Sequence, residues 1–294
     1  MLMSRNYPPS AALRPFITQH HIISDDMPDD SQPTDQVLSE YAFVGIGQSG
    51  DCAIEVKPGI WQRSPDAVLL GSHSRAMRVR VKGPFRMAGI VIRPSGWRAL
   101  FPAPAHEFAD DVAPLAEIWG DAVKRLTERM PGLHSDQQIV DAMEAELKIQ
   151  LSRIGSWCAD PPMQAFEQIA RHDCTRQVKD VAAELDLSER QFERQCLTSF
   201  GHTPKLVLRR SRFLDVAAVI RDMGSQSDED SADLRYFDQS HRNRDFRRFI
   251  GMTPQTFAQT PTPLFTASLK LRLEHRVEID RNRGEATGAN DLRC

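Results

Sequence analysis

Arg190, Glu193 and Arg194 lie close together in a segment with helical periodicity. At 100° per residue the three side chains share one face of a helix. A guanidinium donates two parallel hydrogen bonds to O6 and N7 of guanine, and a carboxylate accepts one from N4 of cytosine. Such a face could therefore read bases in a DNA major groove. The alternative is the solvated face of an ordinary helical hairpin.

The helix that presents these residues has a visible start. Ser188 and Gln191 form an S-x-x-Q capping box, which satisfies free backbone N–H groups at the beginning of a helix. Phe192 and Cys196 fall on the opposite side and are expected to pack in a core. An apolar helical stripe precedes this helix, and a short turn at residues 186–187 joins the two. The segment is therefore predicted to be helix, turn, helix.

The same unit occurs twice. At an offset of fifty residues, Arg194, Gly201, Thr203 and Pro204 are matched by Arg244, Gly251, Thr253 and Pro254. An imperfect repeat of this size indicates two copies of one supersecondary unit. Between them, residues 205–223 are predicted to form one helix. Such a helix would span roughly 28 Å, close to the ~34 Å between successive major-groove segments on one face of B-DNA.

Residues 163–260 resemble the DNA-binding domain of the AraC/XylS family of bacterial transcription regulators. The resemblance rests on VAAELDLSERQFERQCLTSFGHTPKLVLRRSR (181–212) and YFDQSHRNRDFRRFIGMTP (236–254). It implies two helix-turn-helix units whose recognition helices begin at Ser188 and Asp238. The residues that it implies in DNA binding are Ser188, Arg190, Glu193, Arg194, Gln239, Ser240, His241, Asn243 and Arg244.

The second copy departs from the family pattern. Arg235 stands where the family has Gly, Arg242 where it has a buried Phe, and Asp230 where an apolar residue is common. Loss of a buried aromatic side chain costs about 3 kcal/mol, and the acidic residues at 228–233 repel phosphate. We therefore expect the first unit to supply most of the sequence discrimination. The second unit is expected to add DNA-backbone contacts from Arg244, Arg247 and Arg248.

Charge and composition narrow the class of protein. The formal net charge is −3, but residues 187–212 hold six Lys or Arg against two Glu, and residues 242–248 hold four Arg against one Asp. Such basic segments suffice for phosphate contacts. No run of eighteen apolar residues is present, so no membrane span is expected. Five scattered cysteines without a C-x-x-C pair, and a start unlike a secretion signal, indicate a cytoplasmic protein with reduced thiols.

The chain before about residue 100 has the pattern of a β domain. Runs of β-branched residues between turn signals predict strands at 16–23, 41–46, 52–56, 67–70, 77–82 and 86–92. Gly47 and Gly50 are expected to mark turns or bulges. From Ser95 onward helical spacing returns in three apolar stripes. These stripes are expected to cover the sheet or to form a subunit interface.

This part also resembles, more loosely, the cupin-like sensor domain of some AraC-type regulators, in RPFITQHH and VLLGSHSRAMRVRVKGPFRMAGIVIRPSGWRALF. The predicted fold class is α+β, with an antiparallel β domain and covering helices before an all-α domain of two helix-turn-helix units joined by a long helix. A sensor and dimerisation domain is expected over 1–154 and a DNA-binding domain over 163–260. Residues 261–294 are expected to form a mostly disordered tail, with a short docking segment as the alternative.

The residue pattern does not indicate catalysis. The available imidazoles, His20, His21, His73 and His106, form no H-x-H or H-x-x-x-H pair. The sequence contains no nucleophile elbow, phosphate-binding loop or dinucleotide fingerprint. No catalytic residue, metal or cofactor is therefore assigned.

The predicted function is an effector-responsive transcription regulator rather than an enzyme. Its expected partners are double-stranded DNA, a small-molecule effector, a second copy of the chain and RNA polymerase. The rival hypothesis is a cupin-like small-molecule enzyme with an appended DNA-binding domain, and converging imidazoles would favour it. An apolar pocket with a few hydrogen-bonding groups would favour a sensor. A third hypothesis, a ligand-free partner-binding module, requires an exposed stripe from Leu115 to Leu126.

Overall fold

The computed structural model describes residues 2–28, 31–154, 159–223, 236 and 238–274. Residues 275–294 lie outside the described residues. So do the acidic residues at 228–233 and Arg235, which distinguish the second unit from the family pattern. None of the helices in the described part of the chain is long and apolar enough to cross a bilayer.

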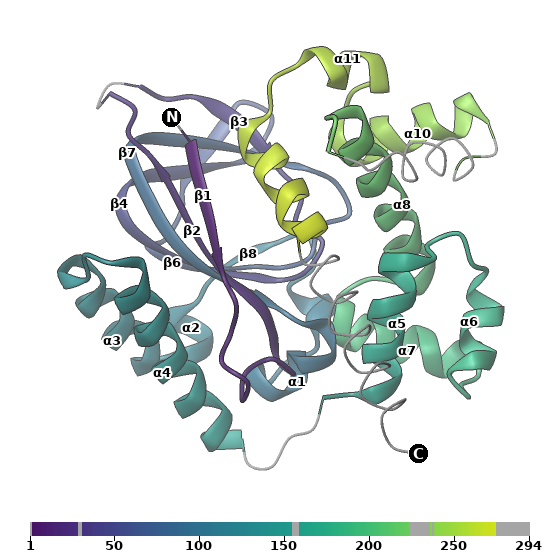
Figure 1. Ribbon diagram of the computed structural model, residues 1–294, viewed down its shortest axis with the longest axis horizontal. Coiled ribbons are helices and arrows are strands. Elements are labelled where there is room, and N and C mark those ends of the chain that lie inside the picture. Colours follow the sequence, from purple (N-terminus) through teal and green to yellow (C-terminus); the bar gives the residue numbers. More distant parts are fainter. Residues whose placement is uncertain (1, 29–30, 155–158, 224–235, 237, 275–294) are drawn as a thin grey trace, which may run out of the picture.

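The N-terminal half is an eight-stranded antiparallel sheet in which β7 and β4 are central (Figure 1). The path through the sheet is β1-β2-β7-β4-β6-β8, and β3 and β5 pair with β7 and β4. The strands are β1 (Leu2–Tyr7), β2 (Ile17–Asp25), β3 (Thr34–Val37), β4 (Phe43–Lys57), β5 (Ile60–Arg63), β6 (Ala67–Leu70), β7 (Met77–Ile92) and β8 (Val112–Pro114).

Two pairs of predicted strands are each one long strand. The predictions at 41–46 and 52–56 both fall on β4, and those at 77–82 and 86–92 both fall on β7. The β4–β7 ladder continues through register shifts between Gly47 and Ser49 and between Ser49 and Asp51. Gly50 adopts a φ of 75°, a conformation that glycine reaches without steric cost. The glycines therefore mark bulges that bend a continuous strand.

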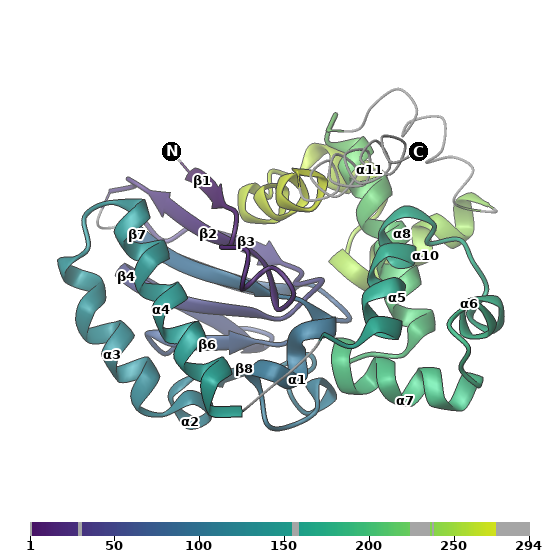
Figure 2. The same cartoon turned by 60° about the horizontal axis from the view of Figure 1, so that its bottom comes forward.

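One face of the sheet packs against helices. Ile22, Val44, Ile46, Ala88 and Ile90 alternate along their strands and are buried in the core of the N-terminal half. Helices α2, α3 and α4 cover this face (Figure 2). The helical elements of this half are η1 (Pro94–Gly96), α1 (Trp97–Leu100), η2 (Ala105–Glu107), α2 (Ala116–Trp119), α3 (Asp121–Arg129), η3 (Met130–Gly132) and α4 (Asp136–Ile154).

The predicted apolar stripes belong to this core. Leu115, Trp119, Val123 and Leu126 are each at most 4% exposed. The stripe from Leu115 to Leu126 therefore covers the sheet, and only Ile118 among its apolar members is half-buried.

The C-terminal half is helical. Its helices are α5 (Pro161–His172), α6 (Val178–Glu184), α7 (Glu189–Phe200), α8 (Pro204–Ile220), α10 (Gln239–Ile250) and α11 (Pro254–Gln259). One aromatic core joins α5 and α7 through Phe166, Phe192 and Phe200. A second joins α8 and α10 through Phe213, Phe246 and Phe249. Each end of α8 thus has its own packed unit.

Residues 263–274 form a further helix, here called the C-terminal helix. Phe265 and Leu269 are fully buried in the core around Phe213. The sequence favoured a disordered tail here because Leu269, Leu271 and Leu273 do not make one helical stripe. The structure shows that this helix buries side chains on two adjacent faces, so a single stripe was the wrong pattern to expect.

Buried charges join the two halves beside the C-terminal helix. Arg272 forms ion pairs with Glu40, which precedes β4, and with Asp215 of α8. Arg210 of α8 donates hydrogen bonds to the carbonyl oxygens of His73 and Glu40, each over 2.6 Å. Arg93, just after β7, pairs with the fully buried Glu167 of α5 over 2.7 Å. Because buried charges need partners, these contacts specify how the halves meet.

Replacement of Leu269 by Ala should lower the free energy of unfolding by about 3 kcal/mol, since it empties a fully buried site. Replacement of the exposed neighbour Lys270 by Ala should change it by less than about 0.5 kcal/mol. Urea denaturation of both variants measures the difference. Equal effects would show that the C-terminal helix is not packed.

Candidate nucleic-acid interface and ligand pocket

Helix α7 has the predicted start and the predicted inner face. The Ser188 hydroxyl accepts from the backbone N–H of Gln191, and the Gln191 side chain accepts in return from the backbone N–H of Ser188. Phe192 and Cys196 are fully buried. At the other end, Gly201 adopts the left-handed conformation with a φ of 78° and ends the helix. The local sequence therefore determines both limits of α7 and its orientation on the core.

The predicted reading face of α7 points to solvent. Arg190, Glu193 and Arg194 are exposed, and Leu197 is half-buried. A shallow surface hollow runs beside these residues, and its other wall is His106 of η2 in the N-terminal half. The face is open along α7 but bordered by the N-terminal half.

Helix α10 repeats this design. The Asp238 carboxylate accepts from the backbone N–H of His241 over 2.6 Å, and Gly251 ends the helix with a φ of 74°. Of the predicted contact residues, His241 and Asn243 are half-buried. Those that are exposed are Gln239, Ser240, Arg244, Arg247 and Arg248.

The inner face of α10 contains a buried carboxylate that sequence reasoning missed. Asp245 is fully buried, pairs with Arg209 of α8 and accepts a hydrogen bond from the Tyr236 hydroxyl over 3.0 Å. Burial, and then the neighbouring Asp245, raise the pKa of Tyr236. Arg242, at the position of Phe192 in the first unit, is half-buried. Polar contacts thus replace part of the aromatic packing that holds α7.

The two helices lie at opposite ends of α8 and run in roughly the same direction across it (Figure 1 and Figure 2). The seventeen residues of α8 make it about 25 Å long. Neither predicted reading face is occluded, because both carry exposed arginines.

Half of the cations counted between residues 187 and 212 are structural. Arg209 pairs with Asp245, and Arg210 is fully buried against backbone carbonyls. Arg212 donates to the carbonyl oxygen of Cys174 over 3.3 Å. The basic charge of this segment therefore overstates what α7 and α8 offer to phosphate.

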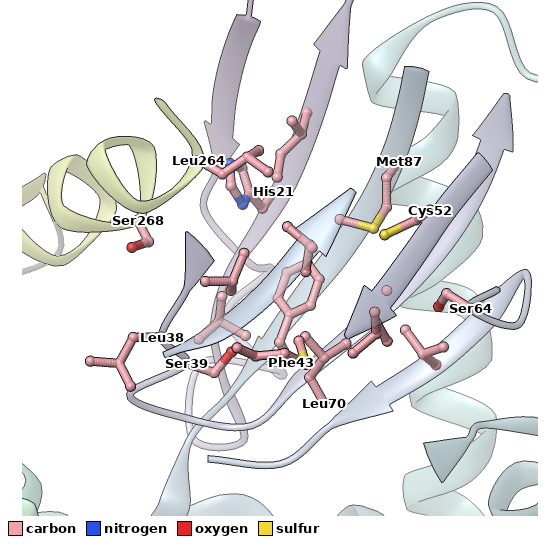
Figure 3. Close-up of a pocket in the computed structure, with 18 of the residues that line it drawn as sticks. His21, Leu38, Ser39, Phe43, Cys52, Ser64, Leu70, Met87, Leu264 and Ser268 are labelled. Carbon is pink, nitrogen blue, oxygen red and sulfur yellow. The ribbon is translucent and has the colours of Figure 1, made fainter. Parts of the chain in front are cut away.

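A cavity of about 220 Å³ lies on the face of the sheet opposite the covering helices (Figure 3). Its strand walls are mostly apolar and include Phe43, Leu70, Val79, Val81 and Met87. The remaining wall comes from Leu214 of α8 and from the C-terminal helix, through Leu264, Ser268 and Leu271. Residues from both halves of the molecule therefore enclose one space.

Glycines give this space part of its shape. Gly45 and Gly89 are direct partners in the β4–β7 ladder. A Cβ atom on Gly89 would lie 1.9 Å from the Phe43 ring, so that ring rests on bare backbone. A side chain at Gly89 would displace the ring into the cavity.

The strand walls carry two neutral polar groups, His21 and Cys52, and an exposed ion pair of Asp51 with Arg63. Burial lowers the pKa of His21 to about 4, and its Nε2 lies 2.7 Å from the Ser4 hydroxyl. Burial raises the pKa of the Cys52 thiol to about 11. Imidazole and thiol are therefore both neutral at pH 7. This part of the cavity suits an apolar molecule.

Charges gather at the end of the cavity near the junction of the halves. Burial alone would raise the pKa of Glu40, but the guanidiniums of Arg272, Arg171 and Arg210 lower it to about 2. Arg171 donates from Nε to the Tyr41 hydroxyl over 3.1 Å, and its Nη1 has no hydrogen-bond partner among the residues that the structure describes. Arg171 is 4% exposed. This end of the cavity therefore offers one buried donor to a bound molecule.

The imidazoles do not converge. His20 lies 3.4 Å from Glu144, His21 lines the cavity, His73 is buried elsewhere and His106 is on the surface. Over the described ranges, no three metal-ligating side chains come together. The arrangement that would favour the rival enzyme hypothesis is therefore not found in this part of the chain.

Comparison with known families identifies both halves. Residues 181–260 match the helix-turn-helix domain family, and residues 5–114 match a domain of unknown function, DUF6597. The chain thus has a C-terminal helix-turn-helix domain of the AraC type behind an N-terminal antiparallel β domain, as the sequence predicted.

Solved structures show distant similarity. ToxT from Vibrio cholerae is 12% identical, with a TM-score of 0.44 over 78% of this chain and 97% of that one. A ToxT structure with a bound unsaturated fatty acid gives 11% identity and a TM-score of 0.44, over 81% and 94%. The AraC-like transcriptional activator CuxR gives 11% and 0.27, over 71% and 84%. A search of curated proteins found no match.

The buried histidine predicts a pH dependence of stability. His21 has a pKa of about 4 when folded and about 6.5 when unfolded, so the unfolded state binds the extra proton between these values. Its contribution is present above pH 6.5 and is lost as the pH falls toward 4. Between pH 7 and pH 5 the loss is about 2 kcal/mol.

The variant His21→Gln should therefore lose about 2 kcal/mol less than the wild type between pH 7 and pH 5. Urea denaturation at both values measures this, with His134→Gln, an exposed histidine, as the control. An unchanged pH dependence in His21→Gln would contradict the buried neutral imidazole.

Proposed function

We propose that the protein is a sequence-specific transcription regulator that reads double-stranded DNA with α7 and α10 and responds to a small apolar effector. The observation that carries the proposal is the exposed face of α7, where Arg190, Glu193 and Arg194 project from a helix that its capping box and its buried opposite face hold in place. Arginine and glutamate on such a helix match the hydrogen-bonding edges of guanine and cytosine.

The two reading helices have different roles in this proposal. Arg190, Glu193 and Arg194 of α7 contact bases, and Ser188 sets the start of that helix. The α10 face contributes mainly contacts to the DNA backbone, through Arg244, Arg247 and Arg248. In support, all three of these arginines are exposed on α10. The remaining proposed contact residues are Gln239, Ser240, His241 and Asn243.

The N-terminal domain, residues 1–154, is the sensor and dimerisation domain in this proposal, and residues 163–260 are the DNA reader. The cavity supports a sensor because it is mostly apolar and has few hydrogen-bonding groups. An effector acts by binding two arrangements of the two halves unequally. In one arrangement the α7 faces of a homodimer reach both half-sites on the DNA. RNA polymerase is then the partner of the DNA-bound homodimer in transcription.

Alanine substitutions test the division between the helices. Arg194→Ala should lower the ratio of specific to non-specific DNA affinity about tenfold or more, because it removes a base contact. Arg244→Ala should weaken both affinities alike and reduce the salt dependence of binding. Fluorescence anisotropy with a selected binding site and a scrambled duplex measures both ratios.

Arg129→Ala, in an exposed position on α3, is the matched control and should change neither quantity. A larger loss of discrimination in Arg244→Ala than in Arg194→Ala would reverse the proposed roles. No loss in either variant would remove the DNA-reading proposal altogether.

The cavity can be tested without knowledge of the natural effector. N-phenyl-1-naphthylamine, a neutral apolar dye, should bind the full chain with enhanced fluorescence. Cys52→Trp fills the cavity from β4 and should weaken the dye at least tenfold, whereas Cys52→Ala keeps the space open and should bind it nearly as well. Equal binding by both variants would place the dye elsewhere.

A further inference from the structure

The C-terminal helix presents two adjacent faces to two different places. Leu264, Ser268 and Leu271 line the cavity, and their spacing of four and three residues puts them on one face. Phe265 and Leu269, one position further along, are buried in the core that contains α10. One short helix is therefore both a wall of the cavity and a part of the second DNA-reading unit.

The helix is tied to both halves near its two ends. The buried carboxylate of Asp35 in β3 accepts a hydrogen bond from the backbone N–H of Leu264. Eight residues later, Arg272 bridges Glu40 before β4 and Asp215 of α8. The helix thus has little freedom to move alone, and a shift of the sheet relative to α8 would break these contacts.

An unbroken series of ring contacts leads from this helix to α10. Phe265 lies 6.2 Å from Phe213 of α8, measured between ring centroids. Phe213 in turn lies 4.8 Å from Phe246 and 5.0 Å from Phe249, both on α10. Close-packed rings of this kind transmit a displacement because they leave no void to absorb it.

The first reading helix has a separate core. Phe192 and Phe200 of α7 pack with Phe166 of α5, in a cluster that contains no residue of the C-terminal helix. This cluster does contain the cavity residue Tyr41, whose ring lies 6.3 Å from that of Phe200, so the C-terminal helix connects the cavity to α10 whereas Tyr41 connects it to α7.

We propose that the C-terminal helix belongs to the effector site, and that an effector in contact with Leu264, Ser268 and Leu271 stabilises the position of α10 through Phe265 and Phe213. The inference rests on the proposed function of the cavity. It gives an effector a route to the second unit through this helix. It also assigns residues 263–274, which lie beyond the matched helix-turn-helix domain, a role in binding and regulation.

Hydrogen exchange of the full chain with and without N-phenyl-1-naphthylamine tests the connection. With the dye at ten times its Kd, amides whose opening requires release of the dye exchange about tenfold more slowly. We expect slowing in residues 263–274 and in α10. Slowing confined to the strands, or slowing in the strands and α7 without α10, would overturn the inference.

A pair of variants tests the wall itself. Ser268→Trp projects into the cavity from the C-terminal helix and should weaken the dye at least tenfold. Lys270→Trp places the same side chain at an exposed position of that helix and should leave the Kd within about twofold. Ser268→Leu is a milder filling and should weaken the dye several-fold, so the test does not depend on one large substitution. Unchanged affinity in both Ser268 variants would overturn the proposed wall.

The outcomes separate the two levels of the argument. If the dye fails to bind the wild-type chain, the effector pocket itself fails and this inference fails with it. A second outcome is that the dye binds the wild-type chain, binds Cys52→Trp weakly and leaves hydrogen exchange in α10 unchanged. In that case the pocket stands, and only the role of the C-terminal helix is overturned.

Discussion

The buried ion pairs of Arg272 with Glu40 and Asp215 are the interaction on which the arrangement of the molecule depends. They bring together three segments that are remote in sequence: the approach to β4, the middle of α8 and the C-terminal helix. Removal of any one partner would leave a buried charge uncompensated, which typically costs 3–5 kcal/mol. This requirement gives the two halves a defined junction, and the cavity ends at that junction.

The sheet serves two purposes because its side chains alternate. One set of residues on β2, β4 and β7 packs against α2, α3 and α4 and stabilises the domain. The other set lines the cavity and does not pack against these helices. Glycine can therefore occupy positions 45 and 89, where a packed core would need a side chain. Residues of α8 and of the C-terminal helix close the cavity on this second face of the sheet. A molecule bound there contacts both domains, which is the condition for coupling binding to their arrangement.

The reading helices show how charge is divided between structure and surface. Arg190 and Arg194 are exposed, whereas Arg209 and Arg210 lie inside the fold with carboxylate and carbonyl partners. The first unit rests on aromatic packing, and the second rests partly on the pair of Asp245 with Arg209. Two copies of one motif therefore differ in their buried contacts, because α10 has this ion pair in addition to its own aromatic packing.

The sequence by itself determined the limits and the faces of α7, the repeat, the spacer helix and the antiparallel β character of the first half, because capping, helical periodicity and strand alternation are local properties. It did not determine that β4 and β7 are continuous through their bulges, that the stripe from Leu115 to Leu126 covers the sheet, or that residues 263–274 close a cavity. Those features depend on which distant surfaces meet. In the sequence, Arg210, Asp245 and Arg272 cannot be told from ordinary solvated charges. The tertiary structure buries them against their partners, so they stabilise the fold, whereas Arg194 is exposed.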